Sequence, residues 1–246
     1  MQIFYLILSL FFISGFYYLG KKFSYSFKLD LIIYKISNPI YQYPSIGISL
    51  LIFIFYPLFF LGFFKVVPFS AISYILVFFG LINFFKNFPN LIYFFKDNFE
   101  NYKKVNFYSL FVTSLLLLYF LLSISPITSG DSLSYHMGAA KYIIQHGQFS
   151  PDLFYTEAAL VGAGEFLNAF ALSINAYQFT SLINFIGIIS IIGIIKKFST
   201  NNLLSIKSQN FLLLCVLSCP ILVFFISSSK SQLFSTSLII FSYALL

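Results

Sequence analysis

The sequence predicts an all-α, polytopic integral membrane protein, and three observations support this prediction. The 246 residues are 59% hydrophobic and only 9% charged, and the mean hydropathy is +0.91. The apolar residues occur in runs of about 20, the length that a helix needs to cross the hydrocarbon core of a bilayer. The basic residues, all of them lysine, cluster beside these runs. The net charge of +7 therefore indicates membrane topology rather than nucleic-acid binding.

Seven runs qualify as membrane-spanning helices within a single transmembrane domain, 1–246. They cover residues 2–19, 46–64, 66–85, 105–124, 176–195, 210–228 and 232–246. The second and third meet at Lys65, so we expect a tight helical hairpin that Pro57 and Pro68 kink or turn. Cys215 and Cys219 lie in the sixth run without further metal ligands, and we interpret them as small core residues. The last run ends at Leu246 without a flanking charge, which indicates a chain cut short at its C-terminus.

The lysines predict the orientation of these helices. If the runs alternate across the bilayer, three lysines lie on one side and eleven on the other, and the positive-inside rule makes the second side cytoplasmic. We therefore expect a multi-pass protein of the bacterial inner (plasma) membrane with an outer N-terminus and an extracytoplasmic loop at 125–175. The smaller group is Lys65, Lys141 and Lys230; the larger is Lys21, Lys22, Lys28, Lys35, Lys86, Lys96, Lys103, Lys104, Lys196, Lys197 and Lys207.

The outer loop collects titratable groups in a chain that has few of them. Such a cluster indicates a functional site, although polar residues also gather in loops without any function. The group consists of Asp131, His136, His146, Asp152, Glu157 and Glu165.

Within this loop, "TSGDSLSYHMGAAKYIIQHG" predicts a turn followed by an amphipathic helix, placed after the fourth span. Asp131 or Ser132 can cap its start, and Gly147 fits the position just past its end. One face of the helix is apolar and can lie on the bilayer surface; it consists of Leu133, Met137, Ala140 and Ile144.

Each candidate residue also has a purely structural interpretation. Spacing alone favours Asp131 as a helix cap over Asp131 as a catalytic base, and His136 alone is more typical of a polar packing residue. Glu165 opens a second helical pattern, where an acidic side chain complements the helix dipole.

The stretch "DSLSYHMGAAKYIIQHGQF" resembles the first extracytoplasmic loop of bacterial membrane glycosyltransferases of the GT-C superfamily. This group includes the protein O-mannosyltransferase-like and lipid A aminoarabinose-transferase-like enzymes. The matching positions are Asp131, the pair Tyr135 and His136, and Gly147. Glu165 resembles the acidic residue that opens the next helix in such enzymes, and Lys230 in "SSSKSQ" is a looser match to a later Ser/Lys patch.

The resemblance implies sugar transfer from a polyprenyl-phosphate donor to a lipid, glycan or protein acceptor on the outer face. Asp131 would be the base that accepts the proton of the attacking hydroxyl. Lys141, His136 or Lys230 would balance the charge of the leaving phosphate. Glu165 would orient the acceptor or help to hold a divalent ion, although the ligands for a metal site are sparse. We therefore expect Tyr135, His136, Lys141, Glu165 and Lys230 in substrate binding, and no protein metal site.

Other classes of protein remain open. A transporter or flippase would line a pathway with ionisable groups, but the apolar runs contain essentially none. A polyprenyl-carrier enzyme such as an O-antigen ligase or polymerase usually relies on an Arg-rich outer loop, and this chain has no Arg. A structural membrane subunit is favoured if Asp131 only caps a helix.

Overall fold

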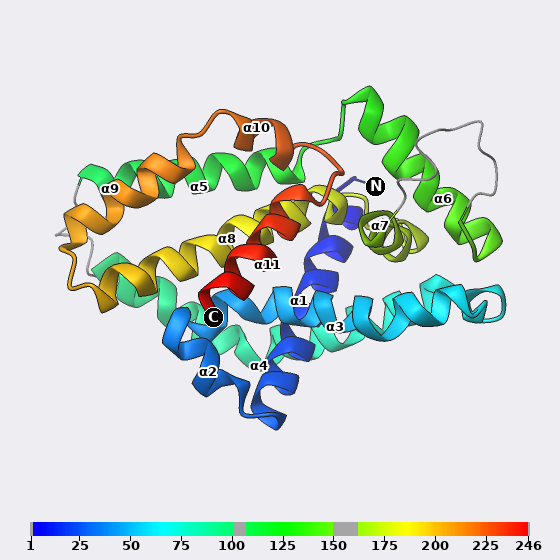
Figure 1. Cartoon of the computed structure of the whole chain (residues 1–246), viewed down its shortest axis with the longest axis horizontal. Coiled ribbons are helices and arrows are strands. Elements are labelled where there is room, and N and C mark those ends of the chain that lie inside the picture. The colour runs from blue at the N-terminus through cyan, green and yellow to red at the C-terminus, as the bar shows by residue number, and fades with distance from the viewer. Residues whose placement is uncertain (1, 101–106, 150–161, 246) are drawn as a thin grey trace.

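The computed structural model describes the backbone of residues 2–100, 107–149 and 162–245, and within these ranges it contains helices and turns but no strand. The all-α prediction is therefore confirmed (Figure 1). Five helices are long and apolar enough to cross a membrane. They are α1 (Gln2–Ser26), α3 (Pro39–Phe60), α4 (Phe69–Glu100, with the apolar part at Phe69–Asn87), α5 (Phe107–Ile124) and α8 (Phe179–Asn201).

Shorter helices complete the described part of the chain. On the side of the expected outer loop these are η1 (Phe63–Lys65), the π-helical turn η3 (Ser132–His136), α6 (Met137–His146) and α7 (Ala163–Ser173). The others are α2 (Leu29–Ile36), α9 (Ile206–Leu217), α10 (Ile221–Ile226) and α11 (Gln232–Leu245).

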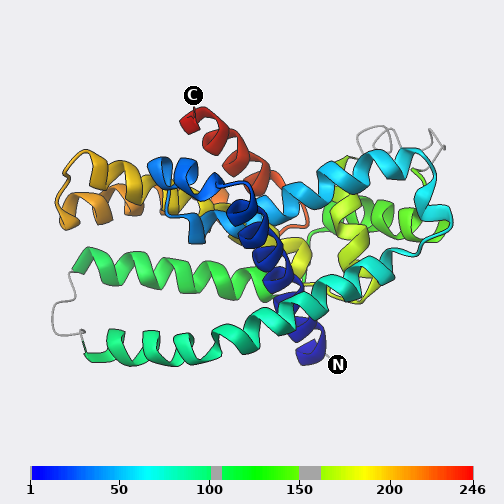
Figure 2. The same cartoon turned by 90° about the horizontal axis from the view of Figure 1, so that it is seen from below.

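Helix α1 packs against both α3 and α4, and these two helices contact α1 far more than they contact each other (Figure 2). Glycines allow the close approach, because a Cβ at Gly15 would overlap the carbonyl oxygen of Leu76, and a Cβ at Gly47 would overlap that of Phe16. The prediction of a tight hairpin between the second and third spans is therefore wrong. Their connection does turn sharply, at Gly62 with a φ of 79°, but α1 occupies the space between them.

Helix α8 is buried along most of its length and lies near the centre of the molecule (Figure 1). It contacts α3, α5, α9 and α11. Buried polar groups join it to neighbouring elements: Gln42 of α3 donates to the carbonyl oxygen of Ser190 at 3.0 Å, and the hydroxyl of Ser190 donates to Oε1 of Gln42 at 2.5 Å. Buried polar groups paired in this way hold helices in a fixed register within an apolar interior.

The predicted span 210–228 is two helices rather than one. α9 ends at Leu217 and α10 begins at Ile221, because Pro220 has no N–H to continue the helical ladder. The Tyr119 hydroxyl donates to the carbonyl oxygen of Leu217, which the interrupted helix leaves without its usual partner. Both cysteines of this region are exposed, so their expected place in the core is wrong.

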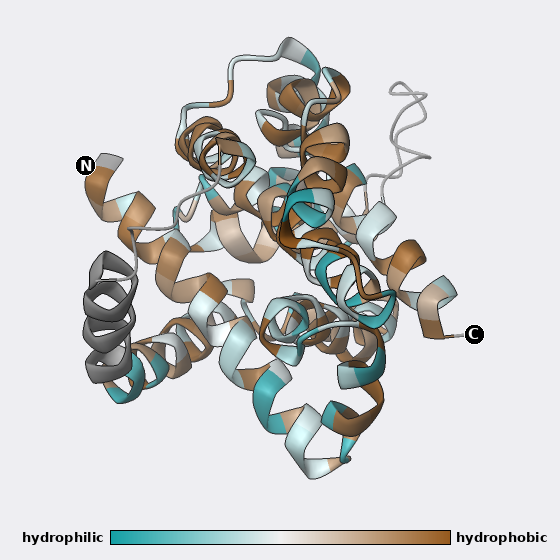
Figure 3. Ribbon diagram, turned by 90° about the vertical axis from the view of Figure 1, so that its left-hand side faces the viewer, coloured by the Kyte–Doolittle hydropathy of each residue, from teal (hydrophilic) through white to brown (hydrophobic). Residues whose placement is uncertain are grey.

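The described part of the last predicted span, 232–246, forms α11 with 14 residues, fewer than a crossing helix usually needs. The described part of the chain thus has five helices long and apolar enough to cross a membrane, where the sequence predicted seven. Large apolar side chains are exposed along these helices, and Figure 3 shows hydrophobic colour along much of their length. Phe53 of α3 is 79% exposed and Leu117 of α5 is 59% exposed. Extensive apolar surface of this kind is expected where helices face lipid, and the chain is a membrane-embedded helical protein.

Candidate functional site

Three segments that are distant in the sequence meet beside the N-terminal end of α8. They are residues 129–136 before α6, residues 162–168 at the start of α7, and residues 227–232 between α10 and α11. We call this region the polar junction. It brings together four of the side chains that the sequence singled out: Asp131, His136, Glu165 and Lys230.

The first segment of the polar junction is a π-helical turn. The backbone N–H of Met137 donates to the carbonyl oxygen of Ser132, five residues earlier. In an α-helix two side chains five residues apart point about 140° away from each other, since each residue turns the helix by about 100°. The wider π turn reduces this angle. The turn therefore brings the side chains of Asp131 and His136 toward one side. The interaction with His136 contributes to the lowered pKa of Asp131.

The third segment is held by buried asparagines of two other helices. Asn184 of α8 donates to the carbonyl oxygen of Lys230 at 2.6 Å and of Phe225 at 2.9 Å. Asn168 of α7 donates to the carbonyl oxygen of Ser229 at 3.2 Å. Ser132 and Ser229 bond each other twice, through one side chain and one backbone group each, at 3.2 Å. These bonds attach the segment that contains Lys230 to the π turn that contains Asp131.

Asp131 forms an ion pair with Lys230. The Asp131 side chain is half exposed, whereas that of Lys230 is mostly buried. The hydrogen bond from Lys230 lowers the pKa of Asp131, partial desolvation opposes this, and the charge of Lys230 adds to the lowering. Asp131 makes no capping hydrogen bond; instead the Ser129 hydroxyl accepts from the Ser132 N–H at 3.2 Å. The predicted cap at Asp131 or Ser132 is therefore wrong.

His136 and Glu165 form a second pair, with 2.5 Å between Nδ1 of His136 and Oε1 of Glu165. The other carboxylate oxygen of Glu165 accepts the N–H of Gly162 at 2.8 Å, which satisfies a free donor at the start of α7. Burial raises the pKa of Glu165, but the bonds from His136 and the two backbone N–H groups outweigh it and lower the pKa overall. Glu165 is thus an ionised carboxylate in a largely buried setting. Its predicted position at a helix start is confirmed.

The other expected residues lie around these two pairs. The Tyr135 ring contacts the His136 ring, with 4.5 Å between their centroids. Lys141 is exposed on α6, and among the described residues no ion pair or hydrogen bond joins it to either carboxylate. Asp152 and Glu157 lie outside the described residues.

Helix α6 exists where the sequence predicted it, and Gly147 ends it with a φ of 63°. The expectation that its apolar face lies on the bilayer surface is wrong, however. Met137 and Ala140 are buried, Ile144 is half-buried against the core, and α6 packs on α7. Leu133, by contrast, is 48% exposed.

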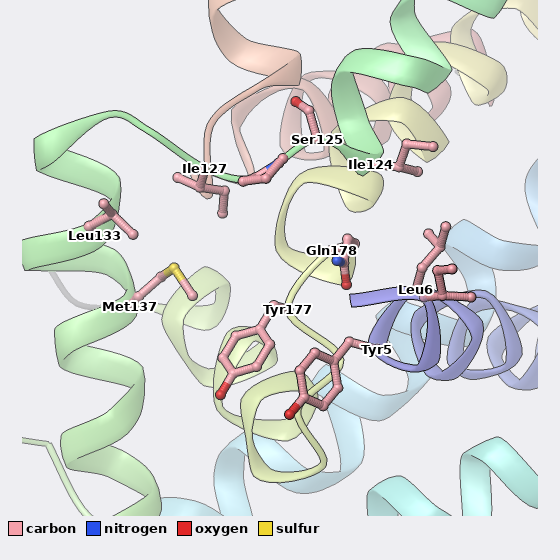
Figure 4. Close-up of a pocket in the computed structure, with 11 residues that line it drawn as sticks. Tyr5, Leu6, Ile124, Ser125, Ile127, Leu133, Met137, Tyr177 and Gln178 are labelled. Atoms are coloured by element: carbon pink, nitrogen blue, oxygen red, sulfur yellow. The ribbon is translucent and has the colours of Figure 1, made fainter. Parts of the chain in front are cut away.

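An apolar pocket of about 480 Å³ opens beside the π turn (Figure 4). Leu133 and Met137 form one side of it, and Tyr5, Leu6 and Tyr177 face them across the cavity. Gln178 also lines the pocket, and its Oε1 is buried without a hydrogen-bond partner in the described part of the chain. Sequence reasoning missed this pocket, because its walls come from four segments that only the fold brings together.

The described residues contain no group of three or more His, Cys, Asp or Glu side chains that could hold a metal ion. Each pair consists of one carboxylate and one nitrogen group, the imidazole of His136 or the ammonium of Lys230. This nitrogen already occupies one oxygen of its carboxylate. This arrangement offers two ionised carboxylates, a cation and an imidazole. None of the four side chains lines the apolar cavity, which the same segment reaches through Leu133 and Met137.

The fold and the polar junction define a class: a helical membrane protein with paired acidic and basic side chains gathered beside an apolar pocket. The chain belongs to the DUF1420 family, since the model of the DUF1420 N-terminal domain matches residues 84–246. This range includes the whole polar junction. No curated protein and no solved structure matches the chain.

Proposed function

We propose that this chain is part of a membrane glycosyltransferase that moves a sugar from a polyprenyl-phosphate donor to an acceptor hydroxyl on the extracytoplasmic face of a bacterial plasma membrane. The observation on which this depends is the ion pair of Asp131 with Lys230, at the start of the turn whose Leu133 and Met137 line an apolar pocket. The GT-C-like sequence pattern of Asp131, Tyr135, His136 and Glu165 supports the same function.

The reaction needs a hydrogen-bond acceptor for the attacking hydroxyl and a cation for the leaving phosphate. Asp131 is kept ionised by Lys230 and is half exposed, so that a hydroxyl can reach it. Lys230 has its own backbone fixed by Asn184, which places its ammonium group as a counter-charge for the phosphate oxygens. Tyr135, His136 and Glu165 surround the acceptor and the sugar.

The apolar pocket suits the first isoprene units of the donor. Its lining is mostly hydrophobic, and it borders the π turn through Leu133 and Met137. A donor with its chain there would have its phosphate near the polar junction, where water and protein charge meet.

The proposed orientation follows from the lysines and agrees with the arrangement of the helices. The turn after α3, with Lys65, touches the end of α6: a Cβ at Gly147 would lie 2.8 Å from backbone atoms of Phe64. The end of α8, with Lys196 and Lys197, lies at the opposite end of the molecule (Figure 2). The lysine-poor end would be extracytoplasmic.

Asp131→Asn in the full chain tests the proposal directly. Asparagine keeps the size and the polarity of the side chain but lacks the negative charge that holds the attacking hydroxyl and pairs with Lys230, so we expect at least a 100-fold loss in the rate of sugar transfer from a polyprenyl-phosphate-sugar donor. Asp131 caps no helix, and thermal stability should change little. Lys230→Ala should also abolish transfer, whereas Lys207→Ala, an exposed lysine of α9, should not. Full activity of Asp131→Asn would contradict the proposal.

A further inference from the structure

The two ring nitrogens of His136 are in different situations. Nδ1 lies 2.5 Å from Oε1 of Glu165, within a hydrogen bond. Within the described ranges, no protein group is bonded to Nε2. The imidazole is 13% exposed, so it is shielded on most sides but still reachable.

Glu165 determines which nitrogen of the neutral ring holds the proton. An ionised carboxylate only accepts hydrogen bonds, so Nδ1 must be the donor. The N–H of Gly162 donates to the Glu165 carboxylate, and this bond and a further backbone N–H favour its ionised form independently of His136. In the neutral ring the lone pair is then on Nε2. This arrangement of a carboxylate, an imidazole and a free Nε2 orients histidines that accept protons in enzymes.

The carboxylate of Asp131 is too weak a base to keep the proton at the end of the reaction. Its pair with Lys230 favours the ionised form, and the pKa of Asp131 is lowered as a result. A neutral imidazole is intrinsically a stronger base than a carboxylate. His136 lies one π turn away and in electrostatic contact with Asp131.

We propose that His136, oriented by Glu165, is a proton-transfer residue of the polar junction, and that Nε2 takes up the proton that the acceptor loses. This inference rests on the proposed function. Asp131 accepts the hydrogen bond of the hydroxyl and orients its oxygen. As the oxygen bonds to the anomeric carbon, the bond from that carbon to the phosphate oxygen breaks, and its electron pair leaves with the phosphate. The hydroxyl proton ends on Nε2, so the new positive charge on His136 balances the new negative charge on the lipid phosphate.

Several charged or titratable groups surround this imidazole. Glu165 of α7 faces it directly, and Asp131 acts on it from its own segment together with Lys230. Tyr135 contacts the ring, and Tyr56 of α3 is in electrostatic contact with Glu165. The proposed proton acceptor thus has two carboxylates and one ammonium group around it.

The tautomer of His136 can be measured without any assay of sugar transfer. The chain has two histidines, and His146 is exposed on α6. In a His146→Asn background, ¹⁵N-histidine NMR of the full chain in lipid nanodiscs reports on His136 alone. In spectra recorded from pH 6 to pH 9, we expect the neutral ring of His136 to have its proton on Nδ1. In Glu165→Gln, part of the population should move to the Nε2–H form, because a neutral amide no longer enforces the donor role of Nδ1.

Three NMR results would overturn the inference. The first is a neutral ring with its proton on Nε2, and the second is the same tautomer with and without the Glu165 carboxylate. The third is an imidazolium that persists from pH 6 to pH 9, since it has no lone pair to accept a proton.

The activity measurement separates this inference from the proposed function. His136→Gln should lower the rate of transfer at least 100-fold and remove the fall in rate at acid pH, whereas His146→Gln should leave both unchanged. If His136→Gln retains the parental rate and pH profile while Asp131→Asn is inactive, the inference fails and the proposed function stands. If the parent chain transfers no sugar, the proposed function fails, and the NMR result still decides the state of His136.

Discussion

Glu165 shows how a single side chain can have a structural and a chemical role at once. One of its carboxylate oxygens stabilises the start of α7 through Gly162, and the other holds His136. Both bonds require the ionised form, which explains why the pKa of Glu165 is lowered even though the side chain is largely buried. A substitution at this position therefore affects the stability of the fold as well as the site.

The lowered pKa of Glu165 predicts a dependence of stability on acid pH. The folded state binds this proton less readily than the unfolded state, so the carboxylate stabilises the fold above its ordinary pKa near 4.5. The stabilisation is lost as the pH falls from there through the lower pKa of the folded state. Glu165→Gln should lower the free energy of unfolding by about 1.5–3 kcal/mol at neutral pH, because it weakens charge-assisted hydrogen bonds.

Thermal unfolding of the parent and of Glu165→Gln from pH 3 to pH 7 measures this effect. The difference between the two proteins should be large at pH 7 and shrink toward pH 3. A constant difference across this range would show that the charge of Glu165 has no part in stability.

Residue identities in the polar junction could be predicted from the sequence, but their pairing could not. Asp131, His136 and Glu165 stand out because the chain has few titratable groups. Their geometry depends on the π turn, which no hydrophobic period encodes. Lys230 reaches Asp131 only because Asn184, far from both in sequence, fixes the backbone between α10 and α11.

At the scale of helices, the sequence predicts long apolar elements well and interrupted ones poorly. The five long helices occur close to predicted runs. The run at 210–228 fails because a hydropathy average does not register the missing N–H of Pro220, which ends α9 here. The packing of α1 between α3 and α4 depends on which glycines face a partner, and this can be seen only in the folded chain.

The contact between α1 and α4 predicts a large effect of a very small change. A Cβ at Gly80 would overlap the carbonyl oxygen of Phe11, so Gly80→Ala forces the two backbones apart. We expect a loss of about 1–3 kcal/mol in the free energy of unfolding, measured by thermal or denaturant unfolding in detergent.

Gly138→Ala in α6 is the matched control, since nothing lies within 4 Å of its added methyl group. Alanine there should be neutral or stabilising by up to about 1 kcal/mol. Equal stabilities for the two variants would contradict the close packing.

For the whole molecule, the five described helices that are long and apolar enough to cross a membrane, together with the distribution of lysines, predict which segments share a side of the membrane. Lys65, in the turn after α3, and Gln145, near the end of α6, should be on one side, and Lys207 at the start of α9 on the other.

Cys215 and Cys219 are exposed and unpaired with each other, so alanine can replace both. Single-cysteine variants Lys65→Cys, Gln145→Cys and Lys207→Cys can then be labelled with a membrane-impermeant reagent from outside intact cells. Labelling of the first two but not of the third is the expected result. Labelling of Lys207→Cys alone would reverse the orientation.

The π turn at Ser132–His136 makes the geometry of the polar junction depend on an exact count of residues. It holds one more residue than an α-helical turn, and the surplus is what directs Asp131 and His136 to a common side. Removing a single amino acid there would let the backbone relax into ordinary α geometry while every side chain named above remained in the protein. Family members that lack this extra residue are therefore expected to have lost the chemistry, even where they keep the aspartate and the histidine.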